Sequence, residues 1–210
     1  MAVLTTGSRR AYLAAEYGAV FFGAVVLYGL VAAGASPIPV LLVLGAAATT
    51  YLLRRPGFDR ARLWRFDAND LPPVLLLWGV TAAVATLTVA VLVPDALFRL
   101  PDQQQWPLLM VIYPLLSVYP QELVFRAFLF ERYAPVFGNG RLMVAASAAA
   151  FGFVHVVYGH WLPVVLSAAG GWIFGERYRR TGSLPAVSVE HSLYGLLMFV
   201  LGLGQFFLSR

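Results

Sequence analysis

Ionisable residues capable of acid–base chemistry interrupt apolar stretches in the second half of the chain. Glu122 and Arg126 stand four residues apart in YPQELVFRAFLFERY, so on a helix they share one face and can pair. His155 lies in AFGFVHVVYGH, and Glu190 and His191 lie in SVEHSLYG. A carboxylate and two imidazoles that converge can bind Zn²⁺ with water in its open position, or can position a water molecule directly for attack.

Each of these residues also has a purely structural interpretation. A charge at mid-bilayer costs about 2.5–3.5 kcal/mol, so Glu122 with Arg126, or Glu190 with any arginine, can be an ion pair that only offsets this cost. A lone histidine can simply hydrogen-bond a carbonyl. A rise of 1.5 Å per residue, however, places Glu122, His155 and His191 at a similar depth on three helices. We therefore predict a shared site, with Glu122, His155 and His191 as candidate metal ligands.

The composition predicts a protein embedded in the lipid bilayer. Apolar residues make up 60% of the 210 residues, charged residues 12%, and the mean hydropathy is +0.75. A soluble domain has about one quarter charged residues. The absence of cysteine excludes disulfides and thiolate metal sites. The chain is basic, but its arginines fall between apolar runs, which indicates membrane orientation rather than nucleic-acid binding.

Seven apolar runs predict an all-α fold, a polytopic bundle of about seven transmembrane helices. The second and sixth runs are short for a hydrocarbon core about 30 Å thick, so one can be tilted or re-entrant. The first run is too long for a signal-peptide core and is interpreted as a retained span. The predicted spans are Tyr12–Ala33, Pro37–Leu53, Pro73–Val93, Pro107–Phe130, Leu142–Tyr158, Leu162–Glu176 and Leu184–Leu208.

The arginines predict the orientation of these spans. If all seven cross the membrane, Arg99 and Arg210 fall on one side. The arginines on the other side are Arg9, Arg10, Arg54, Arg55, Arg60, Arg62, Arg65, Arg132, Arg141, Arg177, Arg179 and Arg180. The positive-inside rule then gives a cytoplasmic N-terminus and an external C-terminus. We expect a multi-pass protein of a prokaryotic plasma membrane.

The chain divides into two parts of one membrane domain. Residues 1–106 supply N-terminal helices and a cytoplasmic loop at 54–70, and residues 107–210 supply the part that carries the ionisable residues. The sequence RRPGFDRARLWRFDAND in this loop mixes aromatic residues with arginine. It is compatible with a segment lying at the lipid headgroups and equally with a plain connection.

Two local patterns concern helix shape. Pro114 and Pro120 each remove a backbone hydrogen bond and can kink the fourth helix near Glu122. In the sixth span, small residues recur at four-residue spacing, which favours close packing of two helices. These residues are Ser167, Gly171 and Gly175.

The order of these residues resembles the CPBP family of intramembrane proteases, also called the Abi or CAAX prenyl endopeptidase family. The resemblance covers Pro107 to Leu208. The motifs of that family are E-E-x-x-x-R, F-x-x-x-H and H-x-x-x-N or H-x-x-x-D. In this chain they read Gln121, Glu122 and Arg126; Phe151 and His155; and His191 and Gly195.

The resemblance implies an intramembrane metalloendopeptidase that hydrolyses a peptide bond of a membrane-associated substrate. Glu/His-activated water would attack the bond in a cavity opening toward the cytoplasm, with or without Zn²⁺. His155 would activate water and His191 would assist the tetrahedral intermediate. The implied partners are a membrane-associated peptide or protein and the lipid bilayer.

Two positions depart from the motifs. Gln121 cannot act as a base, and Gly195 offers no side-chain donor. Glu122, on a rotated helix, or Glu190 can supply the missing carboxylate. The alternative function is a catalytically inactive membrane scaffold or immunity-type protein that keeps the fold. A transporter or channel is a third reading, disfavoured because no internal repeat is evident.

Overall fold

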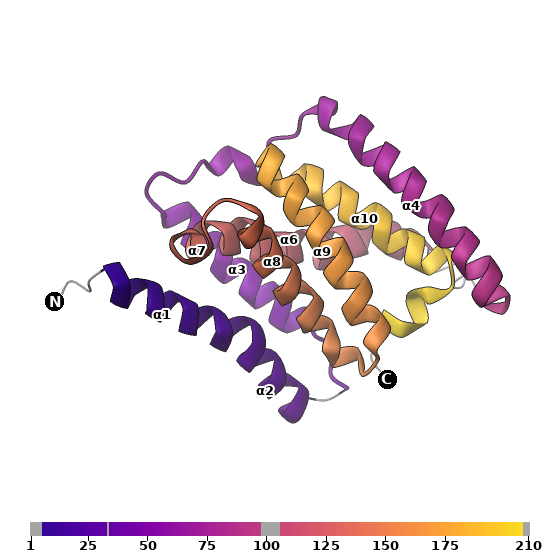
Figure 1. Cartoon of the computed structure of the whole chain (residues 1–210), viewed down its shortest axis with the longest axis horizontal. Helices are drawn as coiled ribbons and strands as arrows, with labels where there is room; N and C mark the ends of the chain where they lie inside the picture. Colours follow the sequence, from indigo (N-terminus) through magenta and orange to yellow (C-terminus); the bar gives the residue numbers. More distant parts are fainter. Residues whose placement is uncertain (1–5, 33, 98–105, 208–210) are drawn as a thin grey trace.

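The computed structural model describes residues 6–32, 34–97 and 106–207, and within these ranges every regular element is helical (Figure 1). The helices form seven rods. The first rod consists of α1 (Thr6–Gly18), η1 (Ala19–Gly23) and α2 (Ala24–Val31), and the second is α3 (Ile38–Arg54). Two short helices follow, η2 (Arg60–Leu63) and η3 (Ala68–Asp70). The third rod is α4 (Leu71–Leu92), which is followed by the short η4 (Pro94–Ala96). The fourth rod, also called the α5–α7 rod, consists of α5 (Trp106–Ile112), η6 (Tyr113–Val118), α6 (Tyr119–Glu122), η7 (Leu123–Phe128) and α7 (Leu129–Phe137). The fifth consists of α8 (Arg141–Val154) and η8 (His155–Tyr158). The sixth is α9 (Trp161–Thr181), and the seventh is α10 (Leu184–Val200), which is followed by the short η9 (Leu203–Phe207).

Hydropathy supports the predicted helical membrane bundle. Gly7–Val31, Ala68–Leu92 and Arg141–Tyr158 are long and apolar enough to cross a membrane, and Ile38–Arg54 and Leu184–Val200 are shorter apolar helices. The protein is thus an all-helical bundle of the kind that the sequence predicts.

Several helix ends differ from the predicted spans. The fourth rod continues beyond Phe130 to Phe137, and α9 continues beyond Glu176 to Thr181. The last helix ends at Val200, ahead of the predicted Leu208, which lies outside the described residues. A helix can continue past its apolar stretch because backbone hydrogen bonds, rather than hydropathy, determine where it ends.

Local signals explain where the helices near the C-terminus begin and end. Gly182 has a φ of +61°, a left-handed conformation that closes α9 and that glycine adopts at little cost. The Ser183 hydroxyl then accepts a hydrogen bond from the Ala186 N–H and caps α10. His160 caps α9 in the same way, with its Nδ1 accepting from the Leu162 N–H.

Helices α8 and α9 approach closely along the small-residue stripe of α9. A Cβ added to Gly171 would lie 3.0 Å from the Cα of Ala148, and one added to Gly175 would lie 3.2 Å from a methyl group of Val144. Ser167, one turn earlier, is buried. The predicted close packing of this stripe is confirmed, and it brings the helix that carries His155 against α9.

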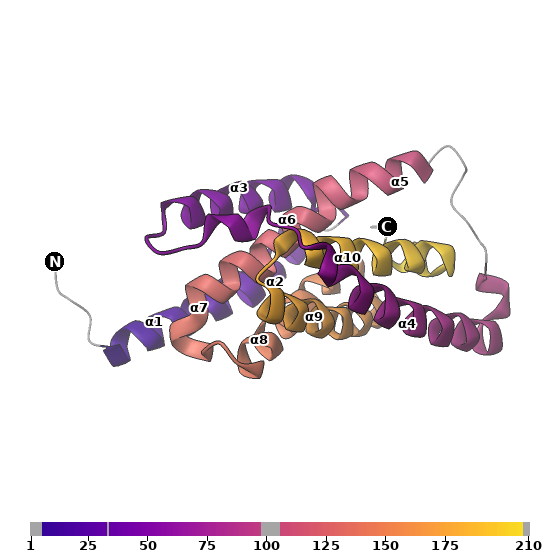
Figure 2. The same cartoon turned by 90° about the horizontal axis from the view of Figure 1, so that it is seen from above.

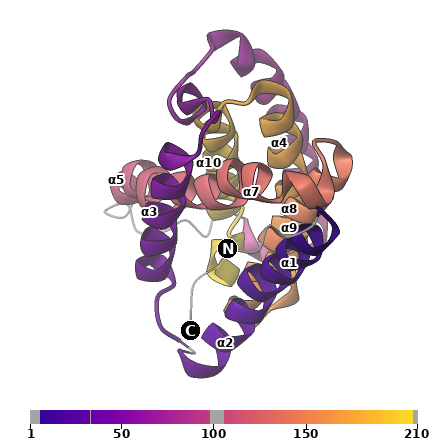
Figure 3. The same ribbon diagram turned by 90° about the vertical axis from the view of Figure 1, so that its left-hand side faces the viewer.

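The N-terminal helices pack on the α5–α7 rod from two directions. In Figure 3, α3 and the α1–α2 rod diverge, and the α5–α7 rod runs across between them. The Arg132 guanidinium donates two hydrogen bonds to Glu16, and the Tyr133 hydroxyl donates a third. These bonds fasten α1 to α7.

Helix α4 lies at the edge of the bundle, beside α10 in both Figure 1 and Figure 2. The Trp78 indole N–H donates to the Leu193 carbonyl, 3.1 Å away. Between α3 and α4, Phe58 and Leu63 are buried, whereas Trp64 and Phe66 are exposed. The 54–70 segment is therefore anchored to the bundle, and its position at the headgroups stays a prediction.

Candidate active site

The fourth rod changes its helical pitch on both sides of the first motif. The four-residue α6 carries Gln121 and Glu122 between two π-helical segments, η6 and η7. Pro114 and Pro120 lack the N–H that an α-helix needs, and the Tyr119 N–H bonds to the Pro114 carbonyl, five residues back. The prolines coincide with an altered helix next to Glu122, as predicted, and π-helical turns are frequent at functional sites.

Glu122 is fully buried and joins two helices. Its Oε1 accepts a hydrogen bond from His191 Nδ1 on α10 at 2.7 Å, and its Oε2 lies 3.1 Å from Arg126 Nε. Oε1 is therefore hydrogen-bonded, whereas Oε2 is ion-paired with Arg126 without a hydrogen bond. The predicted pairing of Glu122 with Arg126 and the convergence of Glu122 with His191 are both present.

Aromatic rings surround Arg126 and His191. The Arg126 guanidinium carbon lies 4.6 Å from the centroid of the Phe151 ring and 5.7 Å from that of Phe174. Phe174 also stacks on the His191 imidazole, with the centroids 4.7 Å apart. Cation–π attraction and the Glu122 carboxylate offset the cost of burying Arg126.

His155 is buried at the end of α8, where η8 begins. Its Nδ1 lies 2.7 Å from the Phe151 carbonyl oxygen, which can only accept, so Nδ1 carries the hydrogen of the neutral ring. Nε2 is then left with a free lone pair, the form that can accept a proton from water. The Phe151 ring contacts both imidazoles, at 5.0 Å from His155 and 5.3 Å from His191.

A cavity of about 300 Å³ opens beside His155 and Gln121. Its walls are mostly apolar and come from η1, α2, α3, the fourth rod and η8. The polar side chains among its lining residues are Ser117, Gln121, His155, Tyr28 and Tyr158. Glu122 does not line this cavity. The neighbouring residues Gln121 and Glu122 therefore face different surroundings.

Gln121 is held in place at the cavity wall. Its Nε2 donates to the Ser117 hydroxyl at 2.7 Å, one turn earlier on the same rod. This bond orients the carboxamide, whose oxygen can accept from water but cannot take a proton. Gln121 and His155 thus line the same cavity.

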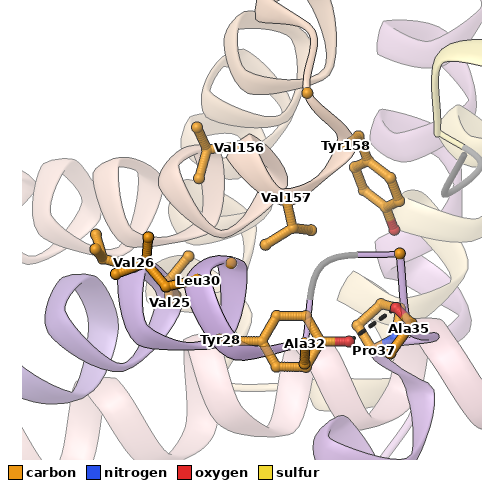
Figure 4. Close-up of a pocket in the computed structure, with 13 residues that line it drawn as sticks. Val25, Val26, Tyr28, Leu30, Ala32, Ala35, Pro37, Val156, Val157 and Tyr158 are labelled. Atoms are coloured by element: carbon orange, nitrogen blue, oxygen red, sulfur yellow. Dashed lines mark hydrogen bonds between the residues drawn. The ribbon is translucent and has the colours of Figure 1, made fainter.

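A second cavity, of about 460 Å³, adjoins the first at one end of the bundle (Figure 4). The two cavities share wall residues, which are Val25, Tyr28, Pro37, Val157 and Tyr158. The Tyr28 hydroxyl donates to the Ala35 carbonyl, 2.8 Å away. The second cavity is lined by α2, η8 and residues near Pro37, whereas the first extends along α3 to Ala48 and along the fourth rod to Phe128. The opening of the cavity toward the cytoplasm stays a prediction.

Glu190 is not hydrogen-bonded to the Glu122–His191 pair and does not line either cavity, although it directly precedes His191. Its carboxylate accepts two hydrogen bonds from Arg177 on α9, at 2.9 and 3.1 Å, and it is fully buried. This matches the structural interpretation of Glu190 as the partner of an arginine.

The predicted metal ligands do not form a donor set in this arrangement. Within residues 6–32, 34–97 and 106–207, no three His, Asp or Glu side chains are grouped closely enough to hold a metal ion. Glu122 uses one oxygen for His191 and the other for Arg126. The Glu122, His155 and His191 side chains as placed here do not fit Zn²⁺, which takes three or four ligands at about 2.0–2.2 Å.

Some cavity residues were missed by the sequence analysis. Ser117 stands four residues before Gln121, a spacing that a helix converts into contact, so this signal was available. Tyr28 and Tyr158 come from rods distant in sequence, and only the packing of the rods brings them to the cavity.

Comparison with known proteins agrees with the motif order. Residues 103–197 match the family model of the Rce1-like type II CAAX prenyl endopeptidases. No curated protein and no solved structure matches the chain. The matched segment contains all three motifs, from Gln121 to Gly195. Over residues 103–197, the chain is thus similar to the CAAX-type intramembrane proteases, and its apolar helices are typical of an integral membrane protein.

Proposed function

We propose that this protein is an intramembrane endopeptidase that hydrolyses a peptide bond in the cavity beside Gln121 and His155. The observation that carries the proposal is that these two side chains, from different helices, line one cavity next to the buried Glu122–His191 pair. A few polar side chains in a mostly apolar cavity suit a substrate whose peptide bond lies close to an apolar chain.

In the proposed reaction, His155 Nε2 accepts a proton from water, and the water oxygen attacks the carbonyl carbon of the peptide. The proton then passes to the leaving amine nitrogen as the C–N bond breaks. Gln121 holds the water through its carboxamide oxygen. Glu122, Arg126 and His191 fix the helices around this site, and no step needs a metal ion or a carboxylate base.

The proposed substrate is a membrane-associated peptide or protein with an apolar or prenyl chain near the cleaved bond. The prenyl chain is proposed from the description of the matching family, the type II CAAX prenyl endopeptidases. The apolar walls supplied by α2 and α3 support an apolar chain independently, because nearly all of the side chains that these helices contribute to the cavity are apolar.

A second candidate is a protein that binds such a peptide without hydrolysing it. Gln121 favours it, because its carboxamide cannot take a proton from water, and the Glu122 carboxylate is held by His191 and Arg126. This candidate corresponds to the scaffold or immunity-type alternative.

Purified protein in lipid nanodiscs, incubated with a library of prenylated and unmodified membrane peptides, separates the two candidates. We expect cleavage that is lost in His155→Ala and kept in His160→Ala, since His160 caps α9 and lines neither cavity. Binding without cleavage by the intact protein would establish the second candidate. Metal analysis of the same samples tests the Zn²⁺ prediction.

The proposed topology has the N-terminus in the cytoplasm of a prokaryotic cell and the C-terminus outside. The arginine distribution supports this orientation. Reporter fusions at residue 66 and at the C-terminus test it. We expect a cytoplasmic signal for the first and an external signal for the second.

A further inference from the structure

Tyr113 and Gly195 meet where η6 packs against α10. A Cβ built on Gly195 would overlap the Tyr113 hydroxyl oxygen and would lie only 2.6 Å from the Tyr113 Cζ. Side-chain carbons do not approach other atoms so closely, so any residue other than glycine at 195 would displace the ring. The Tyr113 phenol thus fills the volume that a side chain at position 195 would occupy.

This volume lies next to His191 of the candidate site. Residue 195 follows His191 by four positions, so both lie on one face of α10. The Tyr113 ring meets the His191 imidazole edge to face, with centroids 6.4 Å apart and planes at 86°. On its own rod, Tyr113 precedes Ser117 and Gln121 at four-residue spacing, and these two residues line the cavity.

We propose that the Tyr113 hydroxyl is the hydrogen-bond donor that the third motif lacks at Gly195, aimed at the substrate carbonyl oxygen as that oxygen gains negative charge. This inference rests on the proposed function and deepens it. A phenol O–H is a good donor, and donors placed at a developing oxyanion contribute strongly to catalysis. The proton stays on the tyrosine oxygen throughout, and no bond to Tyr113 forms or breaks.

Tyr113→Phe tests the donor, because it removes only the hydroxyl. The probes are two hydrolysis-resistant versions of one peptide, an N-methyl amide that mimics the substrate and a phosphinate that mimics the tetrahedral oxyanion. We expect phosphinate affinity to fall by about 10²-fold and amide affinity to stay within about twofold. In the cleavage assay, kcat should fall by a similar factor with KM unchanged. Tyr194→Phe is the matched control, since its hydroxyl lies near Thr81 on α4.

Binding separates failure of this inference from failure of the proposed function. If the intact protein cleaves nothing but prefers the phosphinate, and Tyr113→Phe removes the preference, hydrolysis is rejected and the donor is retained. Equal phosphinate affinity in the two proteins, or no preference in the intact protein, would overturn the donor.

An exchange of side chains tests the shared volume. Gly195→Asn alone should lower the folded yield because the new side chain meets the Tyr113 ring. The double variant Tyr113→Ala with Gly195→Asn should recover the folded yield and, through the asparagine amide, phosphinate binding above that of Tyr113→Ala. Full folded yield of Gly195→Asn, or no recovery in the double variant, would contradict the inference.

Discussion

Gln121 and Glu122 are neighbours on one short helix, yet they belong to opposite kinds of environment. Glu122 is fully buried, with His191 on one oxygen and Arg126 beside the other. Gln121 is partly exposed and lines a cavity with Ser117 and His155. The charged member of the pair is closed into the core, and the uncharged member faces the space that a substrate can enter.

The difference shows that the buried charge and the cavity-lining side chain of this motif are separate residues. Successive residues on a helix point about 100° apart, so one of the two can serve packing while the other serves the cavity. Burial of Glu122 with Arg126 ties the fourth rod to α10 through His191. A motif match therefore identifies the site, while the surroundings of each side chain indicate its role.

The largest expected effect is a loss of stability at the buried Glu122–Arg126 pair. Glu122→Gln leaves the Arg126 guanidinium buried without its carboxylate, which should lower the free energy of unfolding by about 3–5 kcal/mol. Denaturant titration in detergent micelles measures it. The matched control is Glu131→Gln, because the Glu131–Arg55 pair is partly exposed and should contribute less than about 1 kcal/mol. Equal losses in the two variants would remove the distinction between buried and exposed pairs.

The next effect is on the cavity side. Gln121→Glu places a carboxylate in the cavity near His155, where it can act as a general base, so the cleavage rate should rise by about 10²-fold. Peptide cleavage in nanodiscs measures this rise, with Gln121→Ala as the control that adds no base. A rate unchanged in Gln121→Glu would show that position 121 does not face the reacting bond.

The close packing of α9 on α8 should contribute a smaller effect on stability. Gly171→Val should lower the free energy of unfolding by about 1–3 kcal/mol, since a Cβ there already meets the Ala148 backbone. Gly79→Ala on the peripheral α4 is the control, because no atom lies within 4 Å of its added Cβ. Comparable denaturation curves for both variants would contradict the contrast between core and periphery.

The smallest expected effect comes from the support of Gln121. Ser117→Ala removes the hydroxyl that accepts the hydrogen bond from the Gln121 carboxamide. The variant should lower kcat/KM by about 2–10-fold, which corresponds to the loss of one hydrogen bond. Thr88→Ala serves as the control, because its hydroxyl only bonds its own helix on α4. No loss of cleavage in Ser117→Ala would show that the cavity does not depend on a fixed Gln121.

Much of the fold could be predicted from hydropathy, because each apolar run must bury its backbone polar groups in a helix. The Ser167, Gly171 and Gly175 stripe likewise follows from spacing. Helix ends are less predictable, since backbone and capping bonds carry α7 and α9 beyond their apolar stretches.

The candidate site was predicted only in part. The pairing of Glu122 with Arg126, and its contact with His191, follow from spacing and depth. Which of Gln121 and Glu122 faces the cavity depends on π-helical turns that the sequence marks only by prolines. Packing of α9 on α10 selects Arg177 as the partner of Glu190, and no local pattern reveals that pairing.

The central claim, that position 121 faces an accessible cavity, can be tested directly because the chain has no cysteine. Single-cysteine variants Gln121→Cys and Ser147→Cys in nanodiscs would be treated with a small thiol-reactive methanethiosulfonate. Ser147 is fully buried, with its hydroxyl on the Phe125 carbonyl. The account predicts rapid modification at 121 and none at 147 while the protein stays folded. Protection of position 121 to the same degree as position 147 would contradict it.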